Sequence, residues 1–236
     1  MPIVHQCKQR SAEWFELRCS IPTASGFKRI VTPKGKLSSQ CSGYMNELLA
    51  CWILGAPLDR PETMFMEIGT NREPESVAAY EFTTGQETAE VGFVTNDSQT
   101  IGCSPDRLVG DNGILELKNP AAQTHVGYLR SRAIEEEYKP QLQGNLFVCE
   151  RDWIDVQSYY PALPSVIIRV VRDEDYIAAL SSALGQFVDA LLEARLQLTR
   201  DFGVEPKERR AVAETSDEEL RLVDDDVAAI LAARQS

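Results

Sequence analysis

The chain has 236 residues, of which 43% are hydrophobic and 25% charged, as in an ordinary globular α/β domain. No apolar run approaches the roughly 20 residues needed to cross a bilayer, and residues 1–10 hold no signal-peptide core, so we expect a cytoplasmic protein. The net charge of −12 argues against a uniformly basic nucleic-acid surface, but residues 8–36 carry seven basic and two acidic side chains, whereas residues 201–236 carry ten acidic and five basic.

The first third of the chain is helical in pattern. Ser11 is a typical N-cap for a helix whose apolar face carries Trp14 and Phe15. Gly55 is a typical helix end. The helices expected here span residues 11–18, a short segment capped by Thr23 or Ser25, residues 42–54 and residues 68–83.

Between residues 91 and 118 the sequence changes to short β-rich runs separated by turn residues. Asn112-Gly113 is a strong tight-turn signal, because both central positions of a two-residue hairpin turn need positive φ. We expect this turn to join the last two strands of the region as a hairpin. The strands expected here span residues 91–95, 101–103, 107–110 and 114–118.

Helices and strands alternate in the rest of the chain. The order predicts one α/β domain over residues 1–202, with a mixed central β-sheet flanked by α-helices. Residues 203–236 are expected to form a charged C-terminal extension, a linker plus an amphipathic helix that packs on the core or serves another subunit or partner. The later elements expected are helices at 121–132, 136–149 and 173–200 and strands at 153–159 and 166–171.

The residues that point to chemistry lie between positions 102 and 120. Glu116 and Lys118 are two apart on a strand and therefore share a face, while the leucines beside them point to the opposite, packed face. The hairpin brings Asp106 close to that end of the strand. Two facing carboxylates repel each other unless a cation lies between them, and Mg²⁺ binds one or two carboxylates together with phosphate oxygens. The cluster therefore predicts metal-dependent hydrolysis of a phosphodiester, with the lysine acting on the attacking water.

Simpler interpretations of the same residues exist. Asp106 is also a common turn residue, and Glu116 with Lys118 could form the polar face of an edge strand. The apolar neighbours of Glu116 favour a core strand instead. Other chemistries have less support: the six cysteines include no C-x-x-C pair, the two histidines have no nearby partner for a catalytic triad, and no phosphate-loop glycine motif occurs.

Five sequence blocks extend this core motif over most of residues 11–175. In this order and spacing they resemble the lambda-exonuclease, or YqaJ-type viral recombinase, family of the restriction-endonuclease-like PD-(D/E)xK superfamily. The blocks are WFELRCSIPTAS (14–25), GTNREPE (69–75), CSPDRL (103–108), LELKNP (115–120) and YKPQLQ (138–143).

The resemblance implies a metal site with two Mg²⁺ ions, for which Mn²⁺ is a possible substitute. It implies that Asp106, Glu116 and the main-chain carbonyl of Leu117 are ligands and that Lys118 is the catalytic lysine. Glu73 matches an additional acid that helps to hold the second metal.

The resemblance also assigns a pair of glutamines. Gln141 and Gln143 match a Q-x-Q motif on the following helix, near the attacking water or the second metal. Residues two apart on a helix cannot both face one site, so Gln141 is favoured as catalytic and Gln143 is placed among the DNA-binding residues.

For DNA binding, the resemblance implies a pocket for the terminal 5′-phosphate built from Arg18, Ser25 and Ser104. A guanidinium can grip a phosphate with two hydrogen bonds, and hydroxyls add further donors. Met66 falls where the family places an apolar wedge against the terminal base pair, and Lys34 is a candidate contact to the phosphate backbone.

The family further implies a homotrimeric ring that encircles DNA and works beside a single-strand annealing protein. Such a ring could be acidic outside and locally positive in its channel. The charged segment after Phe202 departs from the family's pattern.

The expected function is that of a Mg²⁺-dependent 5′→3′ exonuclease on double-stranded DNA with a 5′-phosphate end. It would release 5′-mononucleotides and leave a 3′ overhang for recombination, in a bacterial or phage-infected cell. The alternatives are another PD-(D/E)xK nuclease, endonucleolytic or repair-associated, and a catalytically inactive DNA-end-binding protein.

Overall fold

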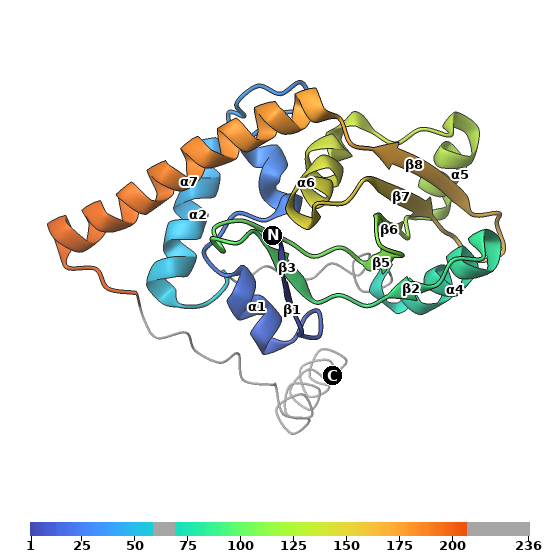
Figure 1. Ribbon diagram of the computed structural model, residues 1–236, viewed down its shortest axis with the longest axis horizontal. Coiled ribbons are helices and arrows are strands. Elements are labelled where there is room, and N and C mark those ends of the chain that lie inside the picture. The colour runs from blue at the N-terminus through green and yellow to red at the C-terminus, as the bar shows by residue number, and fades with distance from the viewer. Residues whose placement is uncertain (59–68, 207–236) are drawn as a thin grey trace, which may run out of the picture.

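The computed structural model describes residues 1–58 and 69–206. Its central sheet is mixed and has five strands (Figure 1). Its strands are β2 (Thr88–Ala89), β5 (Arg107–Val109), β6 (Gly113–Lys118), β7 (Trp153–Ser158) and β8 (Val166–Val171). They lie in the order β2-β5-β6-β7-β8, and all neighbours are antiparallel except β6 and β7, which run parallel. The expected mixed central sheet is confirmed, and β6 lies at its centre.

A second, three-stranded sheet holds the remaining strands. It contains β1 (Ile3–His5), β3 (Phe93–Thr95) and β4 (Gly102–Cys103), paired antiparallel in the order β1-β3-β4. We expected residues 91–95 and 101–103 to be strands, but we predicted neither a second sheet nor β1. Strands of two or three residues are too short to show the alternation that identifies a strand and its sheet.

The helices of the described residues follow the expected order, but the helix expected at residues 136–149 is divided into a short 3₁₀ helix and an α-helix. The Ser11 hydroxyl caps the first helix by accepting a hydrogen bond from the Trp14 amide, as predicted. The short second helix is a 3₁₀ helix, and Thr23 does not cap it with its side chain. The helices are α1 (Ala12–Arg18), η1 (Ala24–Arg29), α2 (Cys41–Leu54), α4 (Glu73–Thr84), α5 (Ala122–Ser131), η2 (Glu136–Tyr138), α6 (Lys139–Cys149) and α7 (Glu174–Phe202).

Helices α4 and α6 lie on opposite faces of the central sheet. Leu115 packs with Tyr80 of α4, whereas Ile114 belongs to the main core together with Leu142 of α6. Because side chains alternate along a strand, Glu116 and Ile114 point to the same face of the sheet, the face covered by α6. The predicted division of β6 into a leucine face and an acidic face is therefore confirmed.

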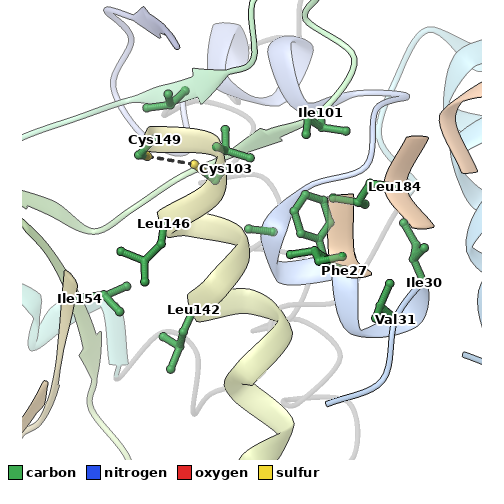
Figure 2. Close-up of a cluster of buried hydrophobic side chains, with 14 of the residues drawn as sticks. Phe27, Ile30, Val31, Ile101, Cys103, Leu142, Leu146, Cys149, Ile154 and Leu184 are labelled. Carbon is green, nitrogen blue, oxygen red and sulfur yellow. Dashed lines mark hydrogen bonds between the residues drawn. The ribbon is translucent and has the colours of Figure 1, made fainter. Parts of the chain in front are cut away.

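The main core lies between α6, η1 and α7. Figure 2 shows α6 running through this core, with Leu142 and Leu146 on the same side of the helix as Ile154 and with Phe27 and Leu184 on the other side. Helix α7 is long and apolar enough to span a membrane by length and composition alone. One face of this helix, which includes Leu180, Leu184 and Leu191, packs into the main core.

The hairpin between β5 and β6 differs from the expected turn. Val109 pairs with Gly113, so three residues connect the strands, and the positive φ of 51° occurs at Gly110. Gly113 lies in the strand, where a Cβ atom would come 2.2 Å from the Trp153 ring. The Arg151 guanidinium secures the turn by donating to the carbonyls of Gly110 (2.8 Å) and Gly113 (2.6 Å). The predicted hairpin is confirmed, but the turn is not centred on Asn112-Gly113, because Gly113 is needed in the strand for close packing and not for turn geometry.

We expect Gly113→Ala to destabilise the protein by about 1–3 kcal/mol, because the added methyl group collides with an aromatic ring. Gly110→Asn should cost less, because asparagine tolerates positive φ and no atom lies within 4 Å of a Cβ at this position. Urea unfolding of both variants checks this order. Equal losses, or a larger loss for Gly110→Asn, would contradict the packing explanation.

Candidate active site

Two carboxylates meet at one end of the β5–β6 hairpin. Asp106 directly precedes β5, and its Oδ2 accepts a hydrogen bond of 2.6 Å from the backbone N–H of Leu117. Glu116 lies in the middle of β6 and is only 4% exposed. Burial, followed by the negative charge of Glu116, raises the pKa of Asp106 well above its usual value. The two acids therefore repel each other in a poorly hydrated place.

Lys118 lies beside this pair. Its Nζ donates a hydrogen bond of 2.8 Å to Glu116 Oε1, and the same nitrogen lies 4.5 Å from the centre of the Tyr138 ring. Burial alone would lower the pKa of Lys118, but Glu116 and Asp106 outweigh burial and raise it. The side chain is therefore an ammonium at neutral pH. In this state it can orient water or neutralise developing negative charge.

Helix α6 contributes two amides to the same carboxylate. Gln141 Nε2 donates to Glu116 Oε1 at 2.7 Å, and Asn145 Nδ2 donates to Glu116 Oε2 at 3.3 Å. The two amides are four residues apart and so lie on one face of the helix. Gln141 was predicted from the sequence, whereas Asn145 was not, although its spacing from Gln141 was a usable signal.

Gln143 lies on a different side of α6. Its amide donates to the carbonyl of Val171 and accepts from the backbone N–H of Asp173, and the residue is 2% exposed. The amide therefore fastens α6 to the connection between β8 and α7. The structure does not bring Gln143 to the site, and a DNA contact is not compatible with this burial.

Glu73 begins α4 on the Asp106 side of the site. Its carboxylate lies 3.8 Å from the Arg10 guanidinium, and its charge is among those that raise the pKa of Asp106. Burial raises the pKa of Glu73 itself, while Arg10 and Arg107 act in the opposite direction. Glu73 is thus close enough to influence the carboxylate pair, and Arg10 is a neighbour that the sequence did not indicate.

These residues fit a divalent cation bound with few protein ligands. Within residues 1–58 and 69–206, no three His, Cys, Asp or Glu side chains form a ready-made metal cage. Mg²⁺ needs only one or two carboxylates, because water and phosphate oxygens complete its shell. A cation beside Asp106 would also relieve the repulsion by Glu116. The Leu117 N–H donates to Asp106. In a strand, the N–H and the C=O of one residue point toward the same edge of the strand. The Leu117 carbonyl therefore also points toward the edge on which Asp106 lies.

A second polar pocket lies where α1, η1 and the segment after β4 meet. Arg18 donates from Nη1 to Ser104 Oγ at 2.9 Å and from Nη2 to Ser25 Oγ at 3.5 Å. Trp14 Nε1 also donates to Ser104 Oγ, at 2.9 Å, and the Arg18 guanidinium lies 4.1 Å from the centre of the indole ring. The structure brings the three predicted phosphate ligands together and adds Trp14, which the sequence argument did not assign to the site.

The charge state of this pocket suits an anion. Burial lowers the pKa of Arg18 to about 10, which still leaves the guanidinium protonated at neutral pH. No carboxylate forms an ion pair with Arg18 among the residues that the structure describes. A half-buried cation without an acidic partner, beside two serine hydroxyl groups, is a favourable environment for a phosphate.

The two pockets are joined by one short segment. Ser104 belongs to the phosphate pocket, and Asp106, two residues later, belongs to the carboxylate site. Gln9 holds the residue between them by donating from Nε2 to the Pro105 carbonyl at 2.8 Å. The distance between the pockets is therefore fixed by the backbone itself.

The other predicted DNA contacts lie elsewhere. Lys34 is exposed on a turn of residues 32–36, which the Tyr176 hydroxyl ties to α7 through the carbonyl of Thr32. It does not line either pocket, and its contact to DNA stays a prediction. Met66 lies outside the described residues.

Comparisons with known proteins agree with this geometry. A family model described as the YqaJ-like viral recombinase domain matches residues 13–152. Crystal structures of LHK-Exo, an alkaline exonuclease from Laribacter hongkongensis, are similar to this chain with a TM-score of 0.74 and 31% sequence identity. The match covers 82% of this chain and 98% of that one, and one of these structures contains dAMP.

A phage-related exonuclease from Haemophilus somnus 129PT has a TM-score of 0.58 and 14% identity, over 74% of this chain and 96% of that one, and so shares the fold. A search of curated protein sequences found no match. The family model covers more than half of the chain and the alkaline exonuclease is similar over most of it, which confirms the resemblance seen in the sequence. The chain belongs to the YqaJ-like viral recombinase family.

Proposed function

We propose that this protein is a Mg²⁺-dependent 5′→3′ exonuclease that degrades one strand of double-stranded DNA to 5′-mononucleotides and leaves a 3′ overhang. Family membership and the likeness to an alkaline exonuclease support a nuclease that acts on DNA. The observation that carries the finer proposal is the arrangement of two pockets on one segment. Asp106 and Glu116 form an acidic site beside Lys118, and Ser104 forms an anion pocket with Arg18.

Each side chain has a defined task in this proposal. Divalent cations held by Asp106, Glu116 and Glu73, with Mn²⁺ as a possible substitute for Mg²⁺, would supply Lewis-acid activation of the phosphate and the water. Glu116 is kept in one orientation by the donors around it. The Lys118 ammonium orients the water and balances the charge that develops on the phosphate.

The second pocket gives the reaction its direction. Arg18 and the two serine hydroxyls would hold the 5′-terminal phosphate, while the next phosphodiester lies at the acidic site. Cleavage of the P–O3′ bond releases a 5′-mononucleotide and creates a new 5′-phosphate. The product strand is then the next substrate, so the same pocket can be used at every step.

We further propose a homotrimeric ring around the DNA, an annealing protein as a partner, and a cytoplasmic location in a bacterial or phage-infected cell. The family membership supports these proposals by analogy. The net charge of −12 is compatible with a ring whose acidic surface faces outward and whose channel is locally basic.

Asp106→Ala should abolish digestion of linear duplex DNA, at least 100-fold below wild type, because one of the two carboxylates at the hairpin end is lost. The measurement is a time course on 5′-phosphorylated linear duplex with and without Mg²⁺. A covalently closed circle serves as the parallel substrate and should stay intact. Cleavage of the circle would support the endonuclease alternative, and end binding without digestion by the wild type would support an inactive end-binding protein.

Mg²⁺ should raise the melting temperature of the wild-type protein but not that of Asp106→Asn, because the amide removes one anionic ligand. Without metal, Asp106→Asn should be at least as stable as wild type, since it removes a buried charge that Glu116 repels. Differential scanning calorimetry checks both statements. Equal stabilisation of the two proteins by Mg²⁺ would place the cation elsewhere.

Arg18→Ala should reduce the preference for 5′-phosphate over 5′-hydroxyl ends by about 10–100-fold, the effect of losing hydrogen bonds to a charged group. Initial rates on duplexes that differ only in the terminal phosphate give this ratio. Lys36→Ala, which changes an exposed cation on the 32–36 turn, is the matched control and should keep the preference. An unchanged ratio in Arg18→Ala would remove this pocket from the proposal.

A further inference from the structure

Asn145 is an amide at a position where the fold would accept an apolar residue. It is 2% exposed, and its neighbours along α6 include the core residues Leu142, Leu146 and Val148. A buried amide without hydrogen bonds costs free energy that an apolar side chain would not. The hydrogen bond that the structure gives this amide goes to Glu116 Oε2.

The donors around Glu116 are not evenly distributed over its two oxygens. Lys118 Nζ and Gln141 Nε2 both donate to Oε1, at 2.8 Å and 2.7 Å. Asn145 Nδ2 donates to Oε2 at 3.3 Å. Asn145 therefore acts on the oxygen that the other two donors leave alone.

This division matters because of how a glutamate side chain rotates. The terminal torsion of glutamate is broad and has no sharp staggered minima. Donors on Oε1 alone hold that oxygen, but the carboxylate can still pivot about it when the torsions nearer the backbone change together with the terminal one. A donor on Oε2 fixes the plane of the carboxylate, and with it the direction in which its remaining lone pairs point.

We propose that Asn145 is a positioning residue that fixes the carboxylate plane of Glu116 for binding a divalent cation. The inference rests on the proposed metal-dependent function, and Asn145 acts only through Glu116. Residues that orient metal ligands typically change metal affinity by about 10–100-fold when they are replaced.

The test measures metal binding without DNA. Isothermal titration calorimetry with Mg²⁺ alone, on the full chain, should show at least about tenfold weaker binding to Asn145→Leu than to wild type. The leucine is close to asparagine in size but has no donor. Asn145→Ala is the second variant, because it adds no atoms that need space, and it should weaken binding in the same way. In nuclease assays both variants should need more Mg²⁺ for half-maximal rate but regain most of the rate at saturating Mg²⁺.

Gln157→Leu is the matched control. Gln157 is also a fully buried amide, but it lies on β7 and donates to the Ser76 carbonyl on α4, on the other face of the sheet. This variant should bind Mg²⁺ like wild type even if it is less stable. Wild-type affinity in both Asn145 variants, or equally weak binding in Gln157→Leu, would overturn the proposal.

The calorimetry also separates this inference from the proposed function. If wild-type protein binds Mg²⁺ but leaves linear duplex intact, the exonuclease proposal is wrong. The Mg²⁺ affinities of the Asn145 variants would still decide the role of Asn145. Wild-type protein that binds no Mg²⁺ would overturn both.

Discussion

The close approach of the half-buried Asp106 carboxylate to the buried carboxylate of Glu116 is the constraint on which the rest of the site depends. Burial and mutual repulsion make this pair unfavourable by itself. The Leu117 N–H, the Lys118 ammonium and two amides of α6 offset part of that repulsion. Local stability is given up at such places when binding or catalysis needs the charge. Because β6 is the central strand, the stability of the surrounding sheet offsets the remaining repulsion between the two carboxylates.

The two sheets of the fold have separate tasks. The central sheet supplies the carboxylates and the lysine, whereas the small sheet ends in β4, directly before Ser104. The segment from Ser104 to Asp106 crosses from one sheet to the other, with Gln9 holding its middle. A site assembled in this way has its spacing set by packed strands on both sides, and not by a loose loop.

Much of the site could be predicted because it depends on local periodicity. The two-residue repeat of a strand placed Glu116 and Lys118 together, and the helical repeat excluded one of the two glutamines. The misplaced turn at Gly113 had a distant cause, the Trp153 ring, which lies 40 positions further along the chain. Contacts of this kind, like the bond from Trp14 to Ser104 across 90 positions, leave no repeat in the sequence. Asn145 was missed because an amide on a mostly apolar helix has no special pattern until its partner is known.

The indole of Trp14 has a consequence for how this molecule can be observed. It is one of three tryptophans, it lies beneath the Arg18 guanidinium, and it shares the Ser104 hydroxyl with it. An anion that draws the guanidinium or the hydroxyl toward itself changes the electrostatic surroundings of this ring. If the proposed 5′-phosphate site beside Arg18 is correct, the emission of Trp14 would be an intrinsic optical signal for the docking of a strand terminus, readable before any bond is cut and without a label.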